Sequence, residues 1–435
     1  MNANQLNQLS RRAFLARTAK TCFGVSIAAS ASSLFGEGAA PPPQAATAKH
    51  VIFLYMSGGM SHIDTLDPKP DAPEKYTGPA KAISTAVDGI QLGACLPLLA
   101  AQMDNVCLLR SLTTTQGAHA QGNYAMHTSY EPRGSIVHPA NGAWVNYLSP
   151  ESKSTLPNYI TVHTGNKHPG AGFFDPSYSP LPIGDANSGI KNAKLNGTSE
   201  ADFHQQVDLR HKLDAPFDEQ FHSGYRDVRA YNEMFDAAIK LMKSEDLEAF
   251  DLSQESDATQ KLYGSGRFAR GCLLARRLVQ RGVRFIEVSN GGFDWHADNF
   301  NLMDLKMPEV DQGLAALLHD LKTLGLLDET LVVLTTEFGR SPEVNGNAGR
   351  GHYPKAFSGL IAGGGVKGGT VYGGTSEFGH EVAHEADKIH PDSLNATIGY
   401  AMGVPYDKVI MSPTKRPFKM SGRKGQPLTS IFNHT

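Results

Sequence analysis

Short, uninterrupted apolar runs recur along the chain and are separated by longer segments of mixed polarity. The clearest run covers 50–56 and leads straight into Ser57, Gly58 and Gly59. An apolar run of strand length without polar alternation is typical of a strand buried on both faces of a sheet. Similar runs lie at 105–109, 159–162, 284–288 and 331–335, with a weaker one at 359–362. The pattern predicts a buried central sheet.

Two segments between these runs carry apolar residues at helical spacing. In 267–280 and in 310–324 the apolar residues form one stripe, and Gly282 and Gly325 follow as natural helix stops. The order helix, strand, helix, strand over 267–335 predicts parallel strands joined by crossover helices. We therefore expect an α/β fold with a mostly parallel central sheet and helices on both faces.

The middle of the chain differs in character from the rest. Residues 163–216 are rich in Gly, Pro, Asn and Asp and show little periodicity, which indicates long surface loops. The segment 217–250 is charged and amphipathic, which predicts helix. We interpret the stretch of about 163–262 as a loop-rich and helical insertion within a single domain of 49–435.

The first 48 residues have the parts of an export signal. Arg11 and Arg12 precede a mildly apolar stretch at 21–35, and small residues at 46–48 form an exit after a proline linker. Paired arginines in this setting resemble the twin-arginine signal, which exports folded proteins. This predicts a periplasmic or extracellular protein that meets the twin-arginine translocase during export. An ordinary amphipathic helix at the N-terminus is the alternative.

Composition narrows the functional classes further. The 435 residues carry 40 Lys and Arg against 43 Asp and Glu, a formal net charge of −3. A general nucleic-acid binder normally has a basic excess, so nucleic acid is not an expected partner. No run approaches the roughly 18 consecutive apolar residues of a membrane-spanning helix, so no stable membrane span is expected.

Carboxylates and imidazoles follow several of the predicted strands and are set among glycines. In open α/β sheets, ligands bind at the carboxyl ends of the strands, so we expect these groups to converge on one rim. Each group alone has an ordinary interpretation, because acids after strands commonly cap the next helix. The candidate metal ligands are His62, Asp64, Asp294, His296, Glu337 and His352.

A cluster of this composition favours a divalent cation, because gathered carboxylates repel one another without one. Mixed imidazole and carboxylate ligands suit zinc, manganese or iron, whereas oxygen ligands alone suit calcium or magnesium. Such ions can activate water and stabilise the leaving oxygen of a phosphate or sulfate ester. Arg340 and Arg350 lie beside the proposed ligands and could bind a tetrahedral anion, or form ordinary salt bridges.

Four motifs at the predicted strand ends carry a resemblance to a known family. They are Met56-Ser57-Gly58-Gly59-Met60-Ser61-His62-Ile63-Asp64, Gly292-Phe293-Asp294-Trp295-His296, Thr336-Glu337-Phe338-Gly339-Arg340 and Gly349-Arg350-Gly351-His352-Tyr353-Pro354. Together they resemble the bacterial family called domain of unknown function 1501, which in turn is similar to the alkaline phosphatase and sulfatase superfamily. The resemblance covers essentially the whole chain after the signal and implies an alkaline-phosphatase-like fold. It also implies metal-dependent hydrolysis of a small-molecule or polysaccharide ester.

The resemblance assigns roles residue by residue. Glu337 stands at the superfamily's metal-binding acid, Asp294 and His296 at the Asp/His pair of the other metal site, and His352 at the late histidine ligand. The first strand lacks the expected acid near Ser57, so His62 and Asp64 would have to substitute for it.

The nucleophile is the main departure. Residues 113–129 resemble the sulfatase segment that carries a modified Cys or Ser, yet 117–123 contain neither. His119 is then a candidate nucleophile or ligand, and the threonines at 113–115 remain alternatives. A non-catalytic envelope binding protein that kept the fold is the competing hypothesis, and a purely structural ion is a third.

Overall fold

The computed structural model describes residues 46–149, 154–165, 167–190, 197, 199–221 and 226–433, without side-chain detail for 217–233. The predicted export signal therefore lies outside the described residues, apart from 46–48. The described residues belong to one compact unit, 44–435. Within this part of the chain, no helix is both long enough and apolar enough to cross a lipid bilayer.

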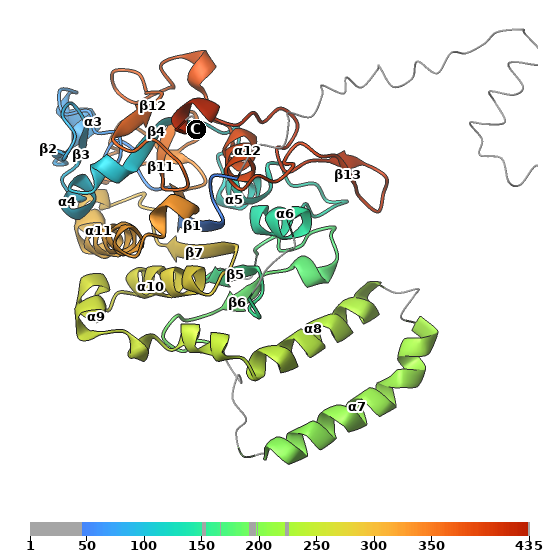
Figure 1. Cartoon of the computed structure of the whole chain (residues 1–435). Helices are drawn as coiled ribbons and strands as arrows, with labels where there is room; N and C mark the ends of the chain where they lie inside the picture. Colours follow the sequence, from blue (N-terminus) through green and yellow to red (C-terminus); the bar gives the residue numbers. More distant parts are fainter. Residues whose placement is uncertain are drawn as a thin grey trace, which may run out of the picture. The chain divides into compact units, whose positions relative to one another are not determined.

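An eight-stranded sheet forms the centre of the molecule, in the order β12-β4-β11-β8-β1-β7-β5-β6 (Figure 1). β1 runs parallel to both of its neighbours, with Phe53 opposite Glu287 of β7 and Val333 of β8. All the predicted apolar runs are strands of this sheet. The strands are β1 His50–Ser57, β4 Val106–Leu112, β5 Tyr159–Val162, β6 Leu181–Ile183, β7 Phe285–Gly291, β8 Thr330–Thr335, β11 Phe357–Ala362 and β12 Thr370–Tyr372.

β11 is antiparallel to both β4 and β8. It follows β8 through a connection that contains only the short strands β9 (Gly339–Arg340) and β10 (His352–Tyr353). An antiparallel neighbour needs no crossover helix, which accounts for the reversal. Because β11 opposes both strands, β4 and β8 run in the same direction, and the prediction of a mostly parallel sheet is confirmed.

Helices cover both faces of the sheet, as predicted. Alternate residues of β1 enter two separate cores, with Ile52 in one and Phe53 in the other. The first core includes the apolar faces of α10 (Arg267–Gln280) and α11 (Asn299–Thr323). The second is completed by α5 (His119–Thr128), α6 (Asn141–Leu148) and α12 (Pro391–Ala401).

The predicted helices differ in how well their bounds agree with the structure. α10 occupies the predicted 267–280. α11 begins at Asn299, well before the predicted 310. Its early turns bury Met303 and Met307 between polar residues and contain Pro308, so the apolar stripe there is too thin to read from the sequence.

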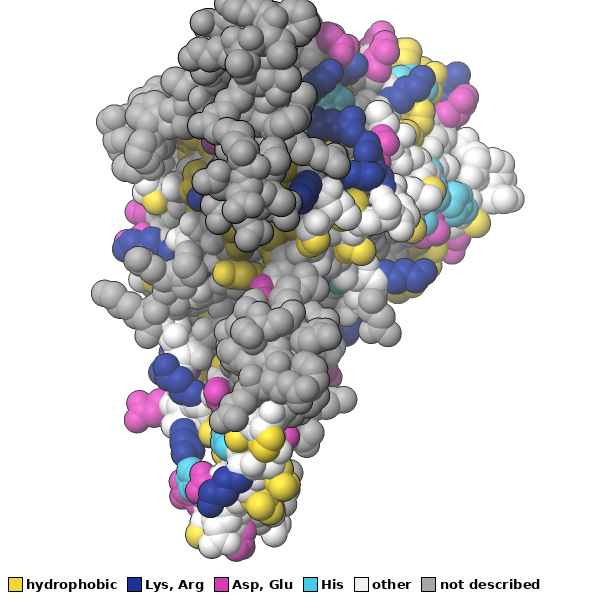
Figure 2. Space-filling view, turned by 90° about the vertical axis from the view of Figure 1, so that its right-hand side faces the viewer, with side chains coloured by type: hydrophobic (Ala, Val, Ile, Leu, Met, Phe, Trp, Pro, Cys, Tyr) yellow, Lys and Arg dark blue, Asp and Glu magenta, His cyan; other side chains and the backbone are white. Residues whose placement is uncertain are grey.

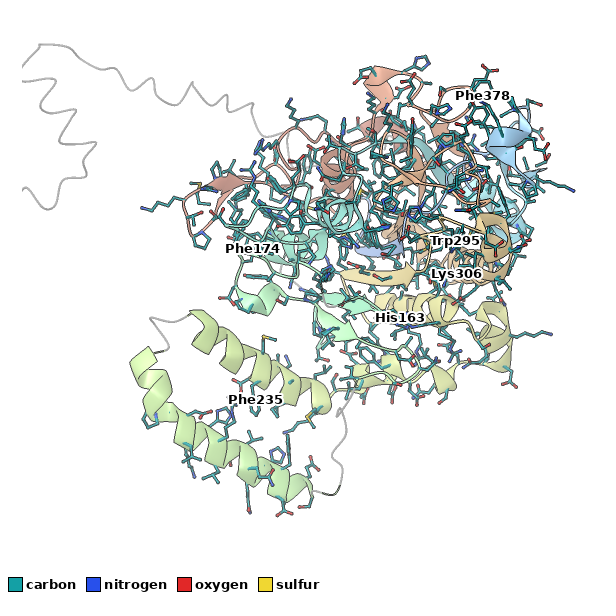
Figure 3. All side chains as sticks on the ribbon, turned by 180° about the vertical axis from the view of Figure 1, so that it is seen from behind. His163, Phe174, Phe235, Trp295, Lys306 and Phe378 are labelled. Atoms are coloured by element: carbon teal, nitrogen blue, oxygen red, sulfur yellow. The ribbon has the colours of Figure 1, made fainter. Side chains whose placement is uncertain are left out.

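The segment expected to form long loops holds a helix instead over 200–216. α7 spans Glu200–Phe221 and is followed by α8, Arg226–Met242. Pro216 inside α7 and its mostly polar surface hid the helical period. The two helices meet where the Arg210 guanidinium lies 3.5 Å from the centre of the Phe235 ring (Figure 3). The expectation of loops is therefore wrong for this part.

The remaining regular elements are short and lie around the sheet. They are α3 Glu74–Thr77, α4 Pro97–Ala100, α9 Asp257–Tyr263, β2 Ala82–Ser84, β3 Gln91–Gly93, β13 Ile410–Met411 and β14 Pro417–Phe418, with 3-10 turns at Met103–Asn105, Pro176–Tyr178, Glu245–Phe250, Leu252–Gln254, Leu327–Glu329, Glu385–Asp387 and Thr429–Ile431.

Candidate metal centre

Four chain segments meet beyond the carboxyl ends of the parallel strands. The loop after β7 carries Asp294 and His296, the turn after β8 carries Glu337, and His119 opens α5 after β4. β10 brings in His352. Loops from different strands converge at this edge because parallel strands all end there.

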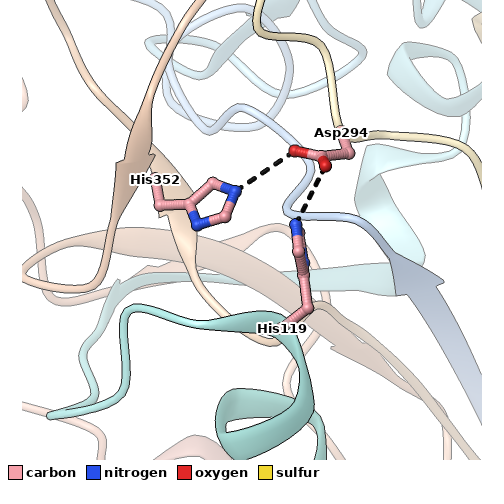
Figure 4. Close-up of side chains that lie close together, drawn as sticks. All are labelled: His119, Asp294 and His352. Atoms are coloured by element: carbon pink, nitrogen blue, oxygen red, sulfur yellow. Dashed lines mark hydrogen bonds and ion pairs between the residues drawn. The ribbon is translucent and has the colours of Figure 1, made fainter.

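The carboxylate of Asp294 is the centre of the cluster. Its Oδ1 accepts a hydrogen bond from Arg340 Nη2 at 2.5 Å and lies 3.0 Å from His296 Nε2 and 3.2 Å from His352 Nε2. Its Oδ2 lies 3.1 Å from His119 Nε2 (Figure 4). The Asp294 side chain is 47% exposed, so solvent reaches the cluster. We call His119, Asp294, His296 and His352 the Asp294 cluster.

The hydrogen bonds of the histidines fix which nitrogens face the centre. Nδ1 of His352 lies 2.9 Å from the carbonyl oxygen of Gly117, which can only accept, so Nδ1 carries hydrogen. Nε2 of His352 faces Asp294 and lies 3.0 Å from His296 Nε2, so its lone pair would be available to an ion bound there. A histidine that binds a metal through one ring nitrogen usually donates the N–H of its other ring nitrogen to a carbonyl or carboxylate.

Glu337 contacts His119 on the side of the ring that faces away from Asp294. Its Oε1 lies 2.7 Å from His119 Nδ1 and accepts the Gly58 N–H at 2.8 Å, while the Tyr55 hydroxyl donates to Oε2 at 3.2 Å. Burial would raise the pKa of Glu337, but the bonds from His119 and the backbone hold that pKa below its ordinary value. The bond to Glu337 raises the pKa of His119, against partial burial.

The donor set of the Asp294 cluster fits a divalent cation. Within the part of the chain that the structure describes, Nε2 of His119 is buried and has no hydrogen-bond partner, although Asp294 Oδ2 is near. The ligand atoms of His119, Asp294 and His352 lie within 4.8 Å of one another. Nε2 of His296 lies 3.0 Å from Asp294 Oδ1 and 3.0 Å from His352 Nε2. Three imidazole nitrogens with a carboxylate suit zinc or manganese better than calcium.

Two glycines allow the loops to approach closely. A side chain on Gly58, whose φ is +118°, would lie 2.6 Å from the Phe293 nitrogen and 2.8 Å from the Asp294 nitrogen. A side chain on Gly349 would collide with the His296 carbonyl. Glycine is needed at both positions because no other residue leaves this space.

Arg340 and Arg350, the two predicted anion-binding residues, are buried, and their guanidinium groups bond to carbonyls and carboxylates of the chain. Arg340 donates to the carbonyls of Gly58, Gly59 and Arg350 and to Asp294, and its side chain is 1% exposed. Its bond to Asp294 offsets the effect of partial burial, and the pKa of that carboxyl stays well below its usual range. Arg340 therefore fixes the Asp294 carboxylate from the buried side of the Asp294 cluster.

Arg350 and Asp64 form a separate, fully buried pair. The guanidinium donates to both carboxylate oxygens at 2.7 Å, and the carbonyls of Tyr76, Ser341 and Pro342 take its other N–H groups. Asp64 also accepts a bond from Asn299. The structure therefore brings these two residues to each other and not to the Asp294 cluster.

His62 is also buried away from the Asp294 cluster. Its Nε2 contacts the Gly379 carbonyl at 3.0 Å, and burial lowers its pKa to about 4. Of the six predicted ligands, the structure therefore gathers Asp294, His296 and His352, with Glu337 one contact further back. The turn after β1 folds inward, and its spacing alone does not reveal this.

A second polar cluster, not anticipated from the sequence, surrounds Glu287 in the middle of β7. This side chain is 1% exposed, and its oxygens lie 3.2 Å from His127 Nε2 and 3.1 Å from His168 Nε2. Burial would raise the pKa of Glu287, but the two imidazoles lower it far more. One signal was present in the sequence, since an acid inside an otherwise apolar strand needs a buried partner.

The Glu287 cluster, which consists of His127, His168 and Glu287, has its hydrogen bonds formed without a metal ion. His127 Nδ1 lies 2.7 Å from the Asn123 carbonyl, so a bond from Nε2 to Glu287 makes the ring an imidazolium. Gly170 N–H donates to His168 Nδ1, which leaves the hydrogen on Nε2 for Glu287. Burial opposes the charge on His127, but the carboxylate raises its pKa overall. This arrangement is a buried ion pair.

The chain belongs to the family described as protein of unknown function DUF1501, which matches residues 48–432. The resemblance predicted from the sequence motifs is thereby confirmed. A search of curated proteins finds no match to the chain.

Three solved structures align with much of the chain at low identity. The lipoteichoic acid synthase LtaP of Listeria monocytogenes has a TM-score of 0.37 and 10% identity, with 89% of this chain and 78% of that chain covered. The PsFucS1 sulfatase of Pseudoalteromonas sp. has a TM-score of 0.37 and 14% identity, with 82% of this chain and 68% of that chain covered. The alkaline phosphatase of the Antarctic bacterium TAB5 has a TM-score of 0.34 and 13% identity, with 73% of this chain and 92% of that chain covered. Likenesses of this strength say nothing about activity, which has to be inferred from the chain's own residues.

Proposed function

We propose that this protein is an exported, metal-dependent hydrolase of phosphate or sulfate esters that acts at the Asp294 cluster. The convergence of three imidazole nitrogens on one half-exposed carboxylate carries the proposal. The signal-like residues at 1–48 support export.

Asp294, His296 and His352 would hold the ion, and zinc or manganese suits their donor atoms. A divalent ion there would polarise the ester and offset the charge of the anionic substrate. Arg340 is a positioning residue, because its bond to Oδ1 fixes the Asp294 carboxylate in one orientation.

His119 acts as the general base. Glu337 holds Nδ1 and orients the ring, so Nε2 faces the Asp294 carboxylate at 3.1 Å. A water proton moves to Nε2 as the water oxygen attacks phosphorus or sulfur and the ester oxygen leaves. A carboxylate that orients a basic imidazole in this way is a recurrent arrangement in hydrolysis.

Metal analysis and turnover in two variants test the proposal. Asp294→Asn should lose both the ion and the hydrolysis of p-nitrophenyl phosphate or sulfate. His119→Ala should keep the ion and lose turnover by about a hundredfold or more. If His119→Ala also loses the ion, all four side chains are ligands. The site is then closed and structural, because a catalytic site keeps an open position.

The lack of Ser and Cys in 117–123 favours a second candidate, a non-catalytic envelope binding protein. That protein would bind anionic esters and ion without turnover. Turnover that depends on His119, measured at unchanged thermal stability, excludes it.

A further inference from the structure

A hollow of about 480 Å³ lies next to the loop that precedes His119. Thr114 and Thr115 line it, and the Gly117 carbonyl two residues later holds His352. Ala125 of α5 lines it too, so α5 connects the hollow with the Asp294 cluster. At a rise of 1.5 Å per residue, the two places lie roughly 9 to 15 Å apart along this helix.

Three cationic side chains surround the hollow: Arg133, Arg423 and Lys424. None has a carboxylate partner among the described residues, and all three are exposed. The two acids of the lining are engaged with the chain itself. Glu131 accepts bonds from the side chains of Thr115 and Gln116 at 3.2 and 3.0 Å, and Asp392 accepts the backbone N–H of Lys424 at 3.3 Å.

Two of these cations, Arg133 and Arg423, act on the neighbouring buried His138. Burial together with Arg133 and Arg423 lowers the pKa of His138 to about 4. This local charge stands out because the whole chain has a formal charge of −3. Lys and Arg side chains gather on the face of the molecule that carries β13 (Figure 2).

We propose that this hollow binds a second anionic group of an extended substrate, a sulfated or phosphorylated oligosaccharide, whose ester is cleaved at the Asp294 cluster. The proposal rests on the proposed function for the cleavage step alone. A monomeric ester spans only one of the two places, whereas an oligomer reaches both.

The lining favours a carbohydrate over a single-stranded nucleic acid. The hydroxyls of Thr114 and Ser393 line the hollow, donate to no other group in the described part of the chain and suit sugar oxygens. The hydroxyls of Thr115 and Ser129 also line it but already donate to Glu131 and to the Met420 carbonyl. Sequence-tolerant single-strand sites stack bases on accessible aromatic rings. Tyr130 lines the hollow, but it is only 9% exposed and stacks on His138.

Calorimetry with fully sulfated maltohexaose on the metal-loaded protein tests the proposal. In the triple variant Arg133→Gln, Arg423→Gln, Lys424→Gln the Kd should rise about tenfold or more, which is about 1.4 kcal/mol. The matched control changes Lys81, Lys240 and Lys261, which are also exposed, to Gln and should stay within about twofold of the wild type. Turnover of p-nitrophenyl esters should be equal in both variants, because a monomer does not reach the hollow.

Several outcomes overturn the proposal. They are equal binding by the two variants, no binding by the wild type, inorganic sulfate binding as tightly as the hexasaccharide, or dT12 binding with the same dependence on the three cations. Failure of the two proposals can be told apart. If binding depends on the three cations but no turnover occurs, the anion site is supported and the hydrolase proposal is wrong. If turnover occurs but binding does not depend on the three cations, the hydrolase proposal is supported and the anion site is wrong.

Discussion

Glu337 Oε1 lies 2.7 Å from Nδ1 of His119, and the Gly58 N–H fixes the same oxygen at 2.8 Å. One buried carboxylate therefore ties the first residue of α5 to the turn after β1. The opposite nitrogen of His119 points at Asp294, so the orientation of the base depends on Glu337.

Glu337→Gln should lower kcat about 10- to 100-fold and leave the metal content unchanged, because only the orientation and basicity of His119 change. The amide oxygen can still accept from Gly58, so thermal stability should change little. Exposed Glu343→Gln is the matched control. Loss of the ion in Glu337→Gln would show that this carboxylate is a ligand.

The Glu287 ion pair should matter for stability and not for metal binding. Glu287→Gln leaves His127 without its counter-charge in the interior, which should cost about 3–5 kcal/mol of unfolding free energy. Chemical denaturation measures this. The exposed pair Lys49–Glu329 provides the control, and Glu329→Gln should cost no more than about 1 kcal/mol. Equal costs would contradict the buried pair.

Acid should destabilise the protein through His138. Its pKa is about 4 in the folded chain and near 6.5 when unfolded, so the unfolded state alone takes up a proton between these values. Stability therefore falls as the pH drops from 6.5 to 4, by up to about 3 kcal/mol for this group. In His138→Asn, which keeps an acceptor for Tyr124, the pH dependence should be shallower by up to one proton. Urea titrations at pH 4 and pH 6.5 measure the free energy of unfolding. If this free energy changes as much with pH in His138→Asn as in the wild type, the prediction is wrong.

Arg350→Lys distinguishes a structural from a substrate-binding arginine. A lysine cannot replace the two parallel bonds to Asp64 or the three carbonyl contacts. The melting temperature should therefore fall by several degrees, with KM for small esters unchanged in the folded fraction. A raised KM at unchanged melting temperature would place Arg350 at the substrate.

The sequence predicted the sheet well, because strands buried on both faces are continuous apolar runs, as in β1 and β8. It did not predict α7, whose polar surface and Pro216 give no clear period. The reversal of β11 was also not visible, since strand direction depends on how the chain returns from β8 and not on the residues of the strand.

The site was predictable only in part. Asp294, His296 and His352 belong to glycine-rich segments at the carboxyl edge, and the structure places them in contact with one another. His62 and Asp64 have the same local signature, yet their turn is buried and Arg350 takes up Asp64. Whether a loop side chain faces solvent or the interior depends on partners far away in the chain, which a single sequence does not reveal.

The metal content of the purified protein decides whether the Asp294 cluster binds a divalent ion. Mass spectrometry of the wild type should find zinc or manganese close to one ion per chain. Asp294→Asn should lose most of it, while the exposed control Asp304→Asn should keep it. A wild-type protein that takes up neither ion when both are supplied, or an Asp294→Asn variant that retains the full complement, would contradict the account.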